Sequence, residues 1–197
     1  MDANTTHKEE LLAVLDDNGS IVKGESVSRT EAHENGILHG ASHIFIYRLS
    51  ESGNIEFLLQ KRSPNKDSYP GCLDISSAGH IEYGMDFLDT ALKELHEELG
   101  LEVNADELYE AFSQHFHKID EFHGEIFDNR EINKIYLLKK DVDITKCVLQ
   151  KEEVSEVLWL DSEEIRVGIN SGAGEICIDA EEFDRVLSFV KKRESLD

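Results

Sequence analysis

The segment between Asp86 and Gly100 constrains the fold of this chain more than any other stretch. Its apolar residues recur at the helical period, at Phe87, Leu88, Ala91, Leu92, Leu95 and Leu99. Asp86 is a residue type that caps the start of a helix, and Gly100 readily adopts the left-handed conformation that ends one. The sequence therefore predicts a helix over residues 86–99 whose apolar face packs against another element.

Three glutamates, Glu94, Glu97 and Glu98, lie together on the polar side of this helix. Like charges at this spacing destabilise an isolated helix by roughly 0.2 to 0.5 kcal/mol per pair. Lys93 can pair with Glu97 at i+4, and solvent can screen the remaining charge. Alternatively, the carboxylates hold a hard divalent cation, Mg²⁺ or Mn²⁺. The helix alone leaves both interpretations open.

The residues that precede the helix favour the metal interpretation. Residues 79–84, Gly-His-Ile-Glu-Tyr-Gly, form a glycine-containing loop that leads directly into the helix. Backbone N–H groups and the helix dipole favour an anion at such a position. We therefore expect an anionic ligand at the start of this helix. Because Mg²⁺ and Mn²⁺ bind carboxylates together with substrate phosphates, an anion here favours a cation at the glutamates.

Strand-like segments flank the helix on both sides. Two hairpins are predicted, one over residues 10–16 and 20–27 and one over residues 42–49 and 55–62. Further strands are expected at residues 73–77, 108–116, 132–138 and 154–160, and a second amphipathic helix at residues 181–193. Strands before and after two helices indicate an α/β or α+β domain with a mixed sheet.

Length and composition indicate one domain. With 197 residues, 40% of them hydrophobic, the chain can bury one ordinary core but hardly two. We expect a single domain over residues 1–197, with residues 1–9 as a flexible N-terminus. The longest apolar runs fall well short of the roughly 20 residues of a membrane span, and the N-terminus lacks a signal-peptide core. These features predict a cytoplasmic protein with no membrane partner.

The charge and the cysteines exclude further classes. A net charge of −22, from 42 acidic and 20 basic residues, repels phosphate backbones and argues against a nucleic-acid partner. A small anionic substrate would need metal cations or a local basic pocket. Cys72, Cys147 and Cys177 form no CxxC pair, so neither a disulfide framework nor a thiolate zinc site is indicated.

The window from Gly79 to Leu101 resembles the Nudix box, G-x5-E-x7-R-E-U-x-E-E-x-G-U, in which U is aliphatic. Seven residues fall on motif positions: Gly79, Glu94, Leu95, Glu97, Glu98, Gly100 and Leu101. Met85 replaces the first motif glutamate and Lys93 replaces the arginine. Glu82 or Asp86 could take over part of the missing carboxylate's role, or could be solvated loop acids.

The resemblance to the Nudix (MutT-like) hydrolase superfamily implies a fold and a site. The implied fold is an α/β/α sandwich with a mixed β-sheet, extended here by an N-terminal β-hairpin. The implied metal ligands for Mg²⁺ or Mn²⁺ are Glu94, Glu97 and Glu98, of which Glu97 and Glu98 are also catalytic candidates. Candidate substrate-binding residues are Gly79, His80 and Arg62. A base from a loop at residues 115–131 is the alternative, with candidates His117, Glu121, His123, Glu125 and Glu131.

Residues 10–160 more specifically resemble the branch that contains isopentenyl diphosphate isomerase. That isomerase uses a cysteine directly before a Gly-His or Ser-His pair, but here Ala78 precedes Gly79-His80. Alanine has no proton to transfer, which argues against isomerisation. The same resemblance implies a second metal site at His33, His39 and Glu131, with His80 as a further histidine that could belong to it.

The sequence thus predicts metal-dependent hydrolysis of a diphosphate linkage. The expected partner is a small phosphorylated substrate, either a nucleoside diphosphate derivative or another small organic diphosphate. Isopentenyl diphosphate isomerase is one alternative, and a catalytically silent nucleotide-sensing module is another, because Met85 and Lys93 depart from the box. The resemblance also allows a homodimer.

Overall fold

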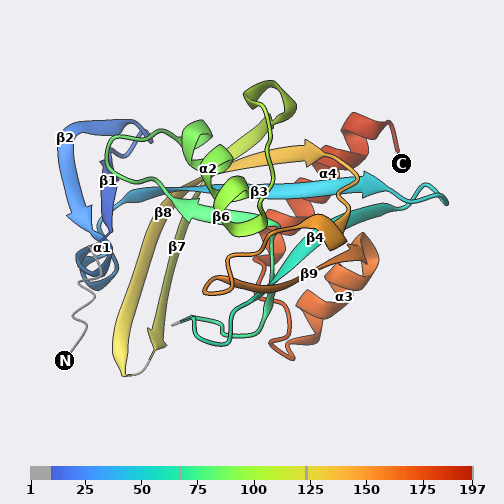
Figure 1. Ribbon diagram of the computed structural model, residues 1–197. Helices are drawn as coiled ribbons and strands as arrows, with labels where there is room; N and C mark the ends of the chain where they lie inside the picture. Colours follow the sequence, from blue (N-terminus) through green and yellow to red (C-terminus); the bar gives the residue numbers. More distant parts are fainter. Residues whose placement is uncertain (1–9, 67, 123, 197) are drawn as a thin grey trace, which may run out of the picture.

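The long strand β3 (His39–Leu49) organises the structure, a computed structural model that describes residues 10–66, 68–122 and 124–196 (Figure 1). On one side β3 pairs in parallel with β8 (Glu125–Lys139). On its other side the first half of β3 pairs with β6 (Ser77–His80) and the second half with β4 (Ile55–Arg62), both antiparallel. Among the described strands β6 pairs only with β3, so the backbone groups along its other edge are not paired with a strand. The predicted flexible N-terminus lies outside the described residues.

The remaining elements complete a mixed sheet with helices. They are β1 (Leu11–Leu15), β2 (Ile21–Ser28), α1 (Arg29–Asn35), β5 (Leu73–Asp74), α2 (Phe87–Leu99), β7 (Tyr109–Phe122), β9 (Val154–Asp161), α3 (Ser162–Ser171) and α4 (Ala180–Glu194), with 3-10 turns at Ala105–Glu107 and Ile144–Lys146. No helix in the described ranges has the length and apolar character needed to cross a membrane.

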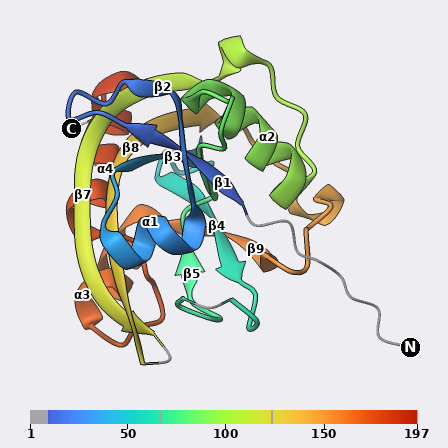
Figure 2. The ribbon, with the colours of Figure 1, turned by 90° about the vertical axis from the view of Figure 1, so that its left-hand side faces the viewer.

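Helices cover both faces of the sheet (Figure 2). On β3, Ile44 and Ile46 belong to the core under α2, whereas Phe45 and Tyr47 belong to the core under α3 and α4. Successive side chains of a strand point to opposite faces, so a strand that is apolar on both sides must be covered twice. The predicted α/β/α sandwich with a mixed sheet is confirmed.

Helix α2 forms as the sequence pattern predicts. The Asp86 carboxylate accepts a hydrogen bond from the Asp89 backbone N–H at 2.9 Å, and Gly100 ends the helix at φ 68°. Leu95 and Leu99 are fully buried against the sheet. The predicted loop before α2 is shorter than expected, because Gly79 and His80 belong to β6.

The N-terminal hairpin of β1 and β2 is confirmed, and it packs against a helix that the sequence did not reveal. Leu12, Val27 and Ala32 form a small core of their own between these elements. Helix α1 has only seven residues, so its apolar pattern is too short to identify it from sequence. It carries His33 toward the sheet.

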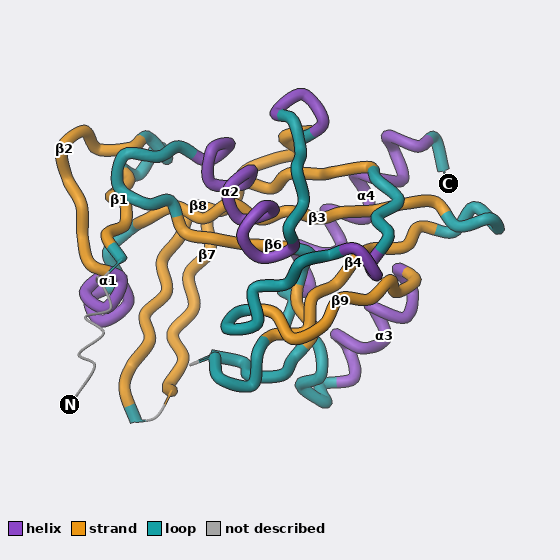
Figure 3. Tube along the Cα trace, in the orientation of Figure 1, coloured by secondary structure: helices purple, strands orange, loops and turns teal. Residues whose placement is uncertain are grey.

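Two predicted elements were wrong in their extent. The strand expected at residues 73–77 is two strands, β5 and β6, that pair with β4 and β3 respectively. In the stretch 115–131, expected to be a loop, residues 115–122 and 125–131 belong to the paired strands β7 and β8, which lie side by side in both ribbon views (Figures 1 and 2) and are coloured as strands in Figure 3. The distal parts of both strands are largely polar and half-buried or exposed, so they show no continuous apolar alternation that would mark them as strands.

Candidate active site

One cleft of about 360 Å³ contains most of the predicted site residues. It runs between α2, the strands β3, β6 and β8, and the first turn of α4. The predicted residues that line it are Arg62, Gly79, His80, Glu94, Glu97, Glu98 and Glu131. The structure therefore brings the box glutamates to one cleft with Glu131 and His80, whereas His33 and His39, the other residues of the predicted second metal site, are buried and do not line it.

Glu98 is the deepest of the three box glutamates and is almost fully buried. Its carboxyl accepts a hydrogen bond from the Ser77 hydroxyl at 2.6 Å. Burial raises the pKa of Glu98 to about 8, and the charges of Glu94 and Glu153 act in the same direction, although the Ser77 hydrogen bond opposes them. A carboxyl that loses its hydration among other carboxylates is a site where a cation restores the ionised form.

Glu94 packs directly on β6, where only glycine leaves room for it. A Cβ atom at Gly79 would lie 2.4 Å from the Glu94 carboxyl carbon. Burial raises the pKa of Glu94 while Lys93 opposes the rise. The motif glycine thus serves close packing here rather than a left-handed backbone conformation.

Lys93 connects three carboxylates. Its ammonium lies 3.2 Å from Glu82, 3.2 Å from Glu94 and 2.8 Å from Glu97. Burial opposes the charge of Lys93, but hydrogen bonds and charges of these glutamates outweigh it and raise its pKa. Glu82 therefore supplies a carboxylate partner for Lys93 where Met85 cannot. Asp86, the other candidate for that role, caps α2.

The three box glutamates share the cleft without forming a compact ligand set. The Glu97 side chain is 45% exposed, unlike those of Glu94 and Glu98. Over the described parts of the chain, one group of acidic, histidine or cysteine residues has its ligand atoms within 4.8 Å of one another, and it consists of His33, His39, His80 and Glu131. The assignment of the metal to the box glutamates stays a prediction.

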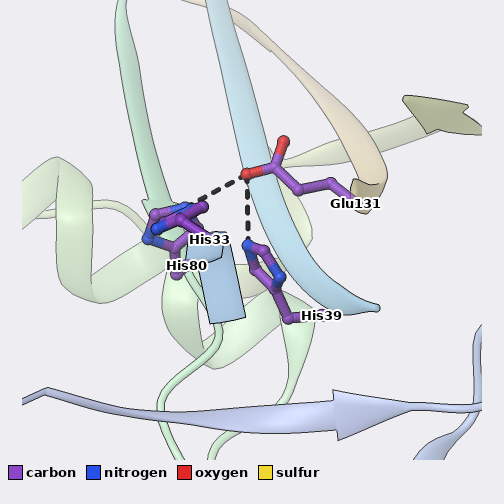
Figure 4. A group of neighbouring side chains, drawn as sticks. All are labelled: His33, His39, His80 and Glu131. Carbon is purple, nitrogen blue, oxygen red and sulfur yellow. Dashed lines mark hydrogen bonds and ion pairs between the residues drawn. The ribbon is translucent and has the colours of Figure 1, made fainter. Parts of the chain in front are cut away.

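Four elements bring the histidine cluster together (Figure 4). His33 comes from α1, His39 from the start of β3, His80 from the end of β6 and Glu131 from β8. Glu131 Oε1 lies 3.1 Å from His80 Nε2 and 3.6 Å from His39 Nε2. His39 and Glu131 are direct neighbours across the parallel β3–β8 pair, which fixes this arrangement in the backbone.

The cluster has the features of a metal site. The Nε2 atoms of His33 and His39 are buried and have no hydrogen-bond partner among the described residues. The Nδ1 atom of His39 lies 2.8 Å from the Ile37 carbonyl, so a proton on Nδ1 leaves Nε2 with a free lone pair. Burial lowers the pKa of His33 to about 3, which keeps its ring neutral. A cation between the rings would satisfy nitrogens that are otherwise costly to bury.

Basic residues in the cleft are already engaged by carboxylates. Arg62, a predicted substrate-binding residue, lies 2.9 Å from Asp74 and also donates to the Ser68 carbonyl. Lys66 pairs with Glu153. These pairs leave little positive charge for an anionic ligand.

Most of the predicted alternative bases lie away from the cleft. His117 pairs with Asp128 at 2.7 Å on the hairpin, and neither it nor Glu121 or Glu125 lines the cleft. His123 lies outside the described residues. Glu131 does line the cleft. The expected loop at residues 115–131 was therefore wrong, because residues 115–122 and 125–131 are paired strands, while an alternative base from this stretch stays a prediction.

Sequence reasoning missed several cleft residues. His43 and Glu182 line the cleft and form an ion pair with 2.8 Å between His43 Nδ1 and Glu182 Oε1. Cys177 also lines it, and burial raises the pKa of its thiol. One signal was present in the sequence: within β3, His43 stands between the small residues 40–42 and the apolar residues 44–46.

The fold and the cleft together define a Nudix-type domain, and comparisons with known proteins agree. The NUDIX domain model matches residues 39–177. Nudix hydrolase 3 of Arabidopsis thaliana is 40% identical over 162 residues, which are 80% of this chain and 20% of that protein. An uncharacterized Nudix hydrolase of Clostridium acetobutylicum is 33% identical over 161 residues, covering 80% of this chain and 73% of the relative.

The chain belongs to the Nudix family, whose hydrolases act on pyrophosphate bonds. It spans about a fifth of the length of the Arabidopsis relative. Among solved structures, the DR0079 protein of Deinococcus radiodurans superimposes with a TM-score of 0.64 at 20% identity, over 89% of this chain and 98% of that one. At this identity the match supports the fold alone. The resemblance to the isomerase branch stays a prediction.

Proposed function

We propose that this protein hydrolyses a diphosphate linkage in a nucleoside diphosphate derivative or another small organic diphosphate, with Mg²⁺ or Mn²⁺ held by Glu94, Glu97 and Glu98. The observation that carries the proposal is the buried carboxyl of Glu98, which shares a cleft with Glu94 and with β6. Its pKa of about 8 marks a position that favours bound positive charge.

The charge of the cleft supports a requirement for a cation. Of the residues that the structure describes, nine acidic ones line the cleft, against four lysines and arginines. Each of these four basic residues is paired with a carboxylate: Arg29 with Glu10, Arg62 with Asp74, Lys66 with Glu153 and Lys93 with Glu82, Glu94 and Glu97. A diphosphate would meet net repulsion unless cations entered with it.

The residues of the cleft would have different roles in hydrolysis. A divalent cation bound here would polarise the diphosphate and lower the pKa of a water molecule. Glu94 and Glu98, held by β6 and Ser77, are the ligands with fixed positions. Glu97 is half exposed and can accept the proton of the attacking water, and Lys93 keeps it next to Glu94. Glu153, which also lines the cleft, is the alternative base from a loop.

We further propose that His33, His39, His80 and Glu131 bind a second cation. The buried Nε2 atoms of His33 and His39, which have no hydrogen-bond partner among the described residues, support this assignment. Three imidazoles and one carboxylate form a donor set that suits Zn²⁺ and other transition metals better than Mg²⁺. The two proposed sites therefore differ in the cation that each prefers.

The experiment for the proposed hydrolysis is a panel of diphosphates incubated with Mg²⁺ or Mn²⁺. Two solved structures with this fold suggest compounds for it: an Ap4A hydrolase of Caenorhabditis elegans, and the NUDIX domain of Shewanella oneidensis NrtR with ADP ribose. The panel also includes nucleoside diphosphates and isopentenyl diphosphate. We expect release of phosphate or a monophosphate by wild type and loss of that release in Glu98→Gln.

The two alternatives give different results in the same panel. Conversion of isopentenyl diphosphate to its isomer would establish isomerase activity despite Ala78. Stoichiometric nucleotide binding by calorimetry, without turnover under any metal or pH tested, would support a sensing module. Product release that persists unchanged in Glu98→Gln would contradict the assignment of the site.

A further inference from the structure

The ring of His43 is held in the cleft by three elements. His43 belongs to β3, and its Nδ1 lies 2.8 Å from Oε1 of Glu182. Glu182 is a nearly fully buried residue in the first turn of α4. The other Glu182 oxygen accepts a hydrogen bond from the side-chain amide of Gln114 on β7, and Arg185 donates to the side-chain oxygen Oε1 of Gln114 at 2.8 Å. Both oxygens of Glu182 are thus engaged, so the orientation of the His43 ring is fixed.

The second nitrogen of that ring is free. Nε2 of His43 has no hydrogen-bond acceptor among the described residues, and unlike Nε2 of His33 and His39 it is not a buried atom. The His43 side chain is 19% exposed, and its exposed part borders the cleft. A donor that three elements orient, and that has no acceptor in the described parts of the chain, is suited to a ligand.

His43 also differs in charge from its neighbours. Burial opposes its protonation, but the charge and hydrogen bond of Glu182 outweigh burial and raise the pKa of His43 to about 9. The other charged groups that act on it are Glu131 on β8 and Asp74 on β5, and both favour the imidazolium. The ring therefore offers a charged N–H donor at neutral pH.

Strand β6 relates His43 to the box glutamates. Ala78 is the cross-strand neighbour of His43, and the next residue, Gly79, packs on Glu94. Successive residues of a strand point to opposite faces, so His43 and Glu94 lie on opposite sides of β6. The free edge of this strand lets one ligand reach both, and the small side chain of Ala78 leaves space beside the imidazole.

We infer that His43, oriented by Glu182, binds an anionic phosphate oxygen of the substrate from the side of β6 opposite Glu94. This inference rests on the proposed hydrolysis. It adds a second subsite, which binds a phosphate oxygen away from the cation proposed at the box glutamates. A charged donor favours an anionic oxygen over a hydroxyl because charge-assisted hydrogen bonds are about twice as strong. Glu182 acts through His43 and is a positioning residue.

Binding can be measured without turnover. Histidine side-chain nitrogen signals are recorded by NMR while wild type is titrated with inorganic pyrophosphate and Ca²⁺, and with ribose as a neutral probe. The His43 signals are assigned from their absence in His43→Gln. We expect pyrophosphate to shift Nε2 of His43 and ribose to leave it unchanged. His117, which pairs with Asp128 outside the cleft, is the matched histidine that should not respond.

Affinity and pH dependence separate this role from a structural one. His43→Gln should weaken pyrophosphate binding by about tenfold, the value of one charge-assisted hydrogen bond, whereas His117→Gln should not change it. Relative to His43→Gln, wild type should lose its advantage as the pH rises through about 9. In Glu182→Gln, that loss should occur at a lower pH, because the group that raises the His43 pKa is gone. A residue with a structural role alone would not move this profile.

The outcomes distinguish this inference from the proposed function. A pyrophosphate-dependent shift of His43 without turnover of any diphosphate supports the subsite and contradicts hydrolysis. Turnover with an unchanged KM in His43→Gln, or absence of a shift at any pyrophosphate concentration, overturns the subsite and leaves hydrolysis in place. An equal shift with ribose overturns the preference for an anion.

Discussion

The ion pair between His43 and Glu182 makes a defined contribution to stability that depends on pH. In the folded protein the pKa of His43 is about 9, against 6.5 for the free side chain. Because the folded value is the higher one, the pair contributes fully below pH 6.5, and the contribution is lost as the pH rises through about 9. Stability from this source therefore falls across the neutral and mildly alkaline range.

The size of the effect follows from the two pKa values. The difference between about 9 and 6.5 corresponds to about 3 kcal/mol of unfolding free energy. At pH 8 about half of this contribution should remain, because the unfolded histidine is then neutral and the folded one is still charged. With 19% of the His43 side chain exposed, solvent screening reduces the value only moderately.

The assay compares urea unfolding of wild type with that of the double variant His43→Gln/Glu182→Gln at pH 6, 8 and 9.5. The two amides keep similar size and remove both charges, and all other groups titrate in both proteins. We expect the difference in unfolding free energy to shrink by about 3 kcal/mol from pH 6 to pH 9.5. A difference that stays constant, or that grows with pH, would refute the reasoning.

Three further predictions concern the box and the core. Gly79→Ala should destabilise the protein by about 1 to 3 kcal/mol and lower kcat, because its methyl group would displace Glu94; unchanged urea unfolding and turnover would contradict this. Glu82→Gln should lower kcat yet change stability by less than about 1 kcal/mol, since its pair with Lys93 is partly exposed; equal kcat would show that Glu82 does not support the box. Leu95→Ala should cost about 2 to 5 kcal/mol in thermal or urea unfolding, with a smaller loss indicating that the core collapses around it.

Local signals explain why α2 and the hairpins of β1–β2 and β3–β4 could be predicted. A helix is recognised by the period of its apolar residues and by its capping residues, and these hairpins are recognised by their turn residues. All of these signals lie within a few positions of one another. The box glutamates follow from the same helix. The sequence also showed that Met85 replaces a motif glutamate. It did not show which acid pairs with Lys93 instead, because that depends on the path of the chain between Gly79 and Asp86.

Contacts between distant segments explain what the sequence could not provide. The histidine cluster needs α1 and three strands in a particular order, and its members were named through resemblance rather than through spacing. The pair of His43 and Glu182 joins residues 139 positions apart. No local pattern places the first turn of α4 against β3, because sheet order and helix docking depend on the whole chain. The same holds for the distal parts of β7 and β8, residues 117–122 and 125–131, whose polar sequence is recognisable as strand only by its pairing.

The charge pairs of the cleft connect fold and chemistry. Each carboxylate that pairs with Lys66, Lys93 or Arg62 also restrains that cation from binding a substrate. A diphosphate must therefore bring its own counter-charge or find donors that the protein has left open. Two features meet this need: the box glutamates, where burial favours a cation, and His43, whose second ring nitrogen has no acceptor among the described residues. Divalent metal would then be required for the substrate to bind as well as for its bond to break.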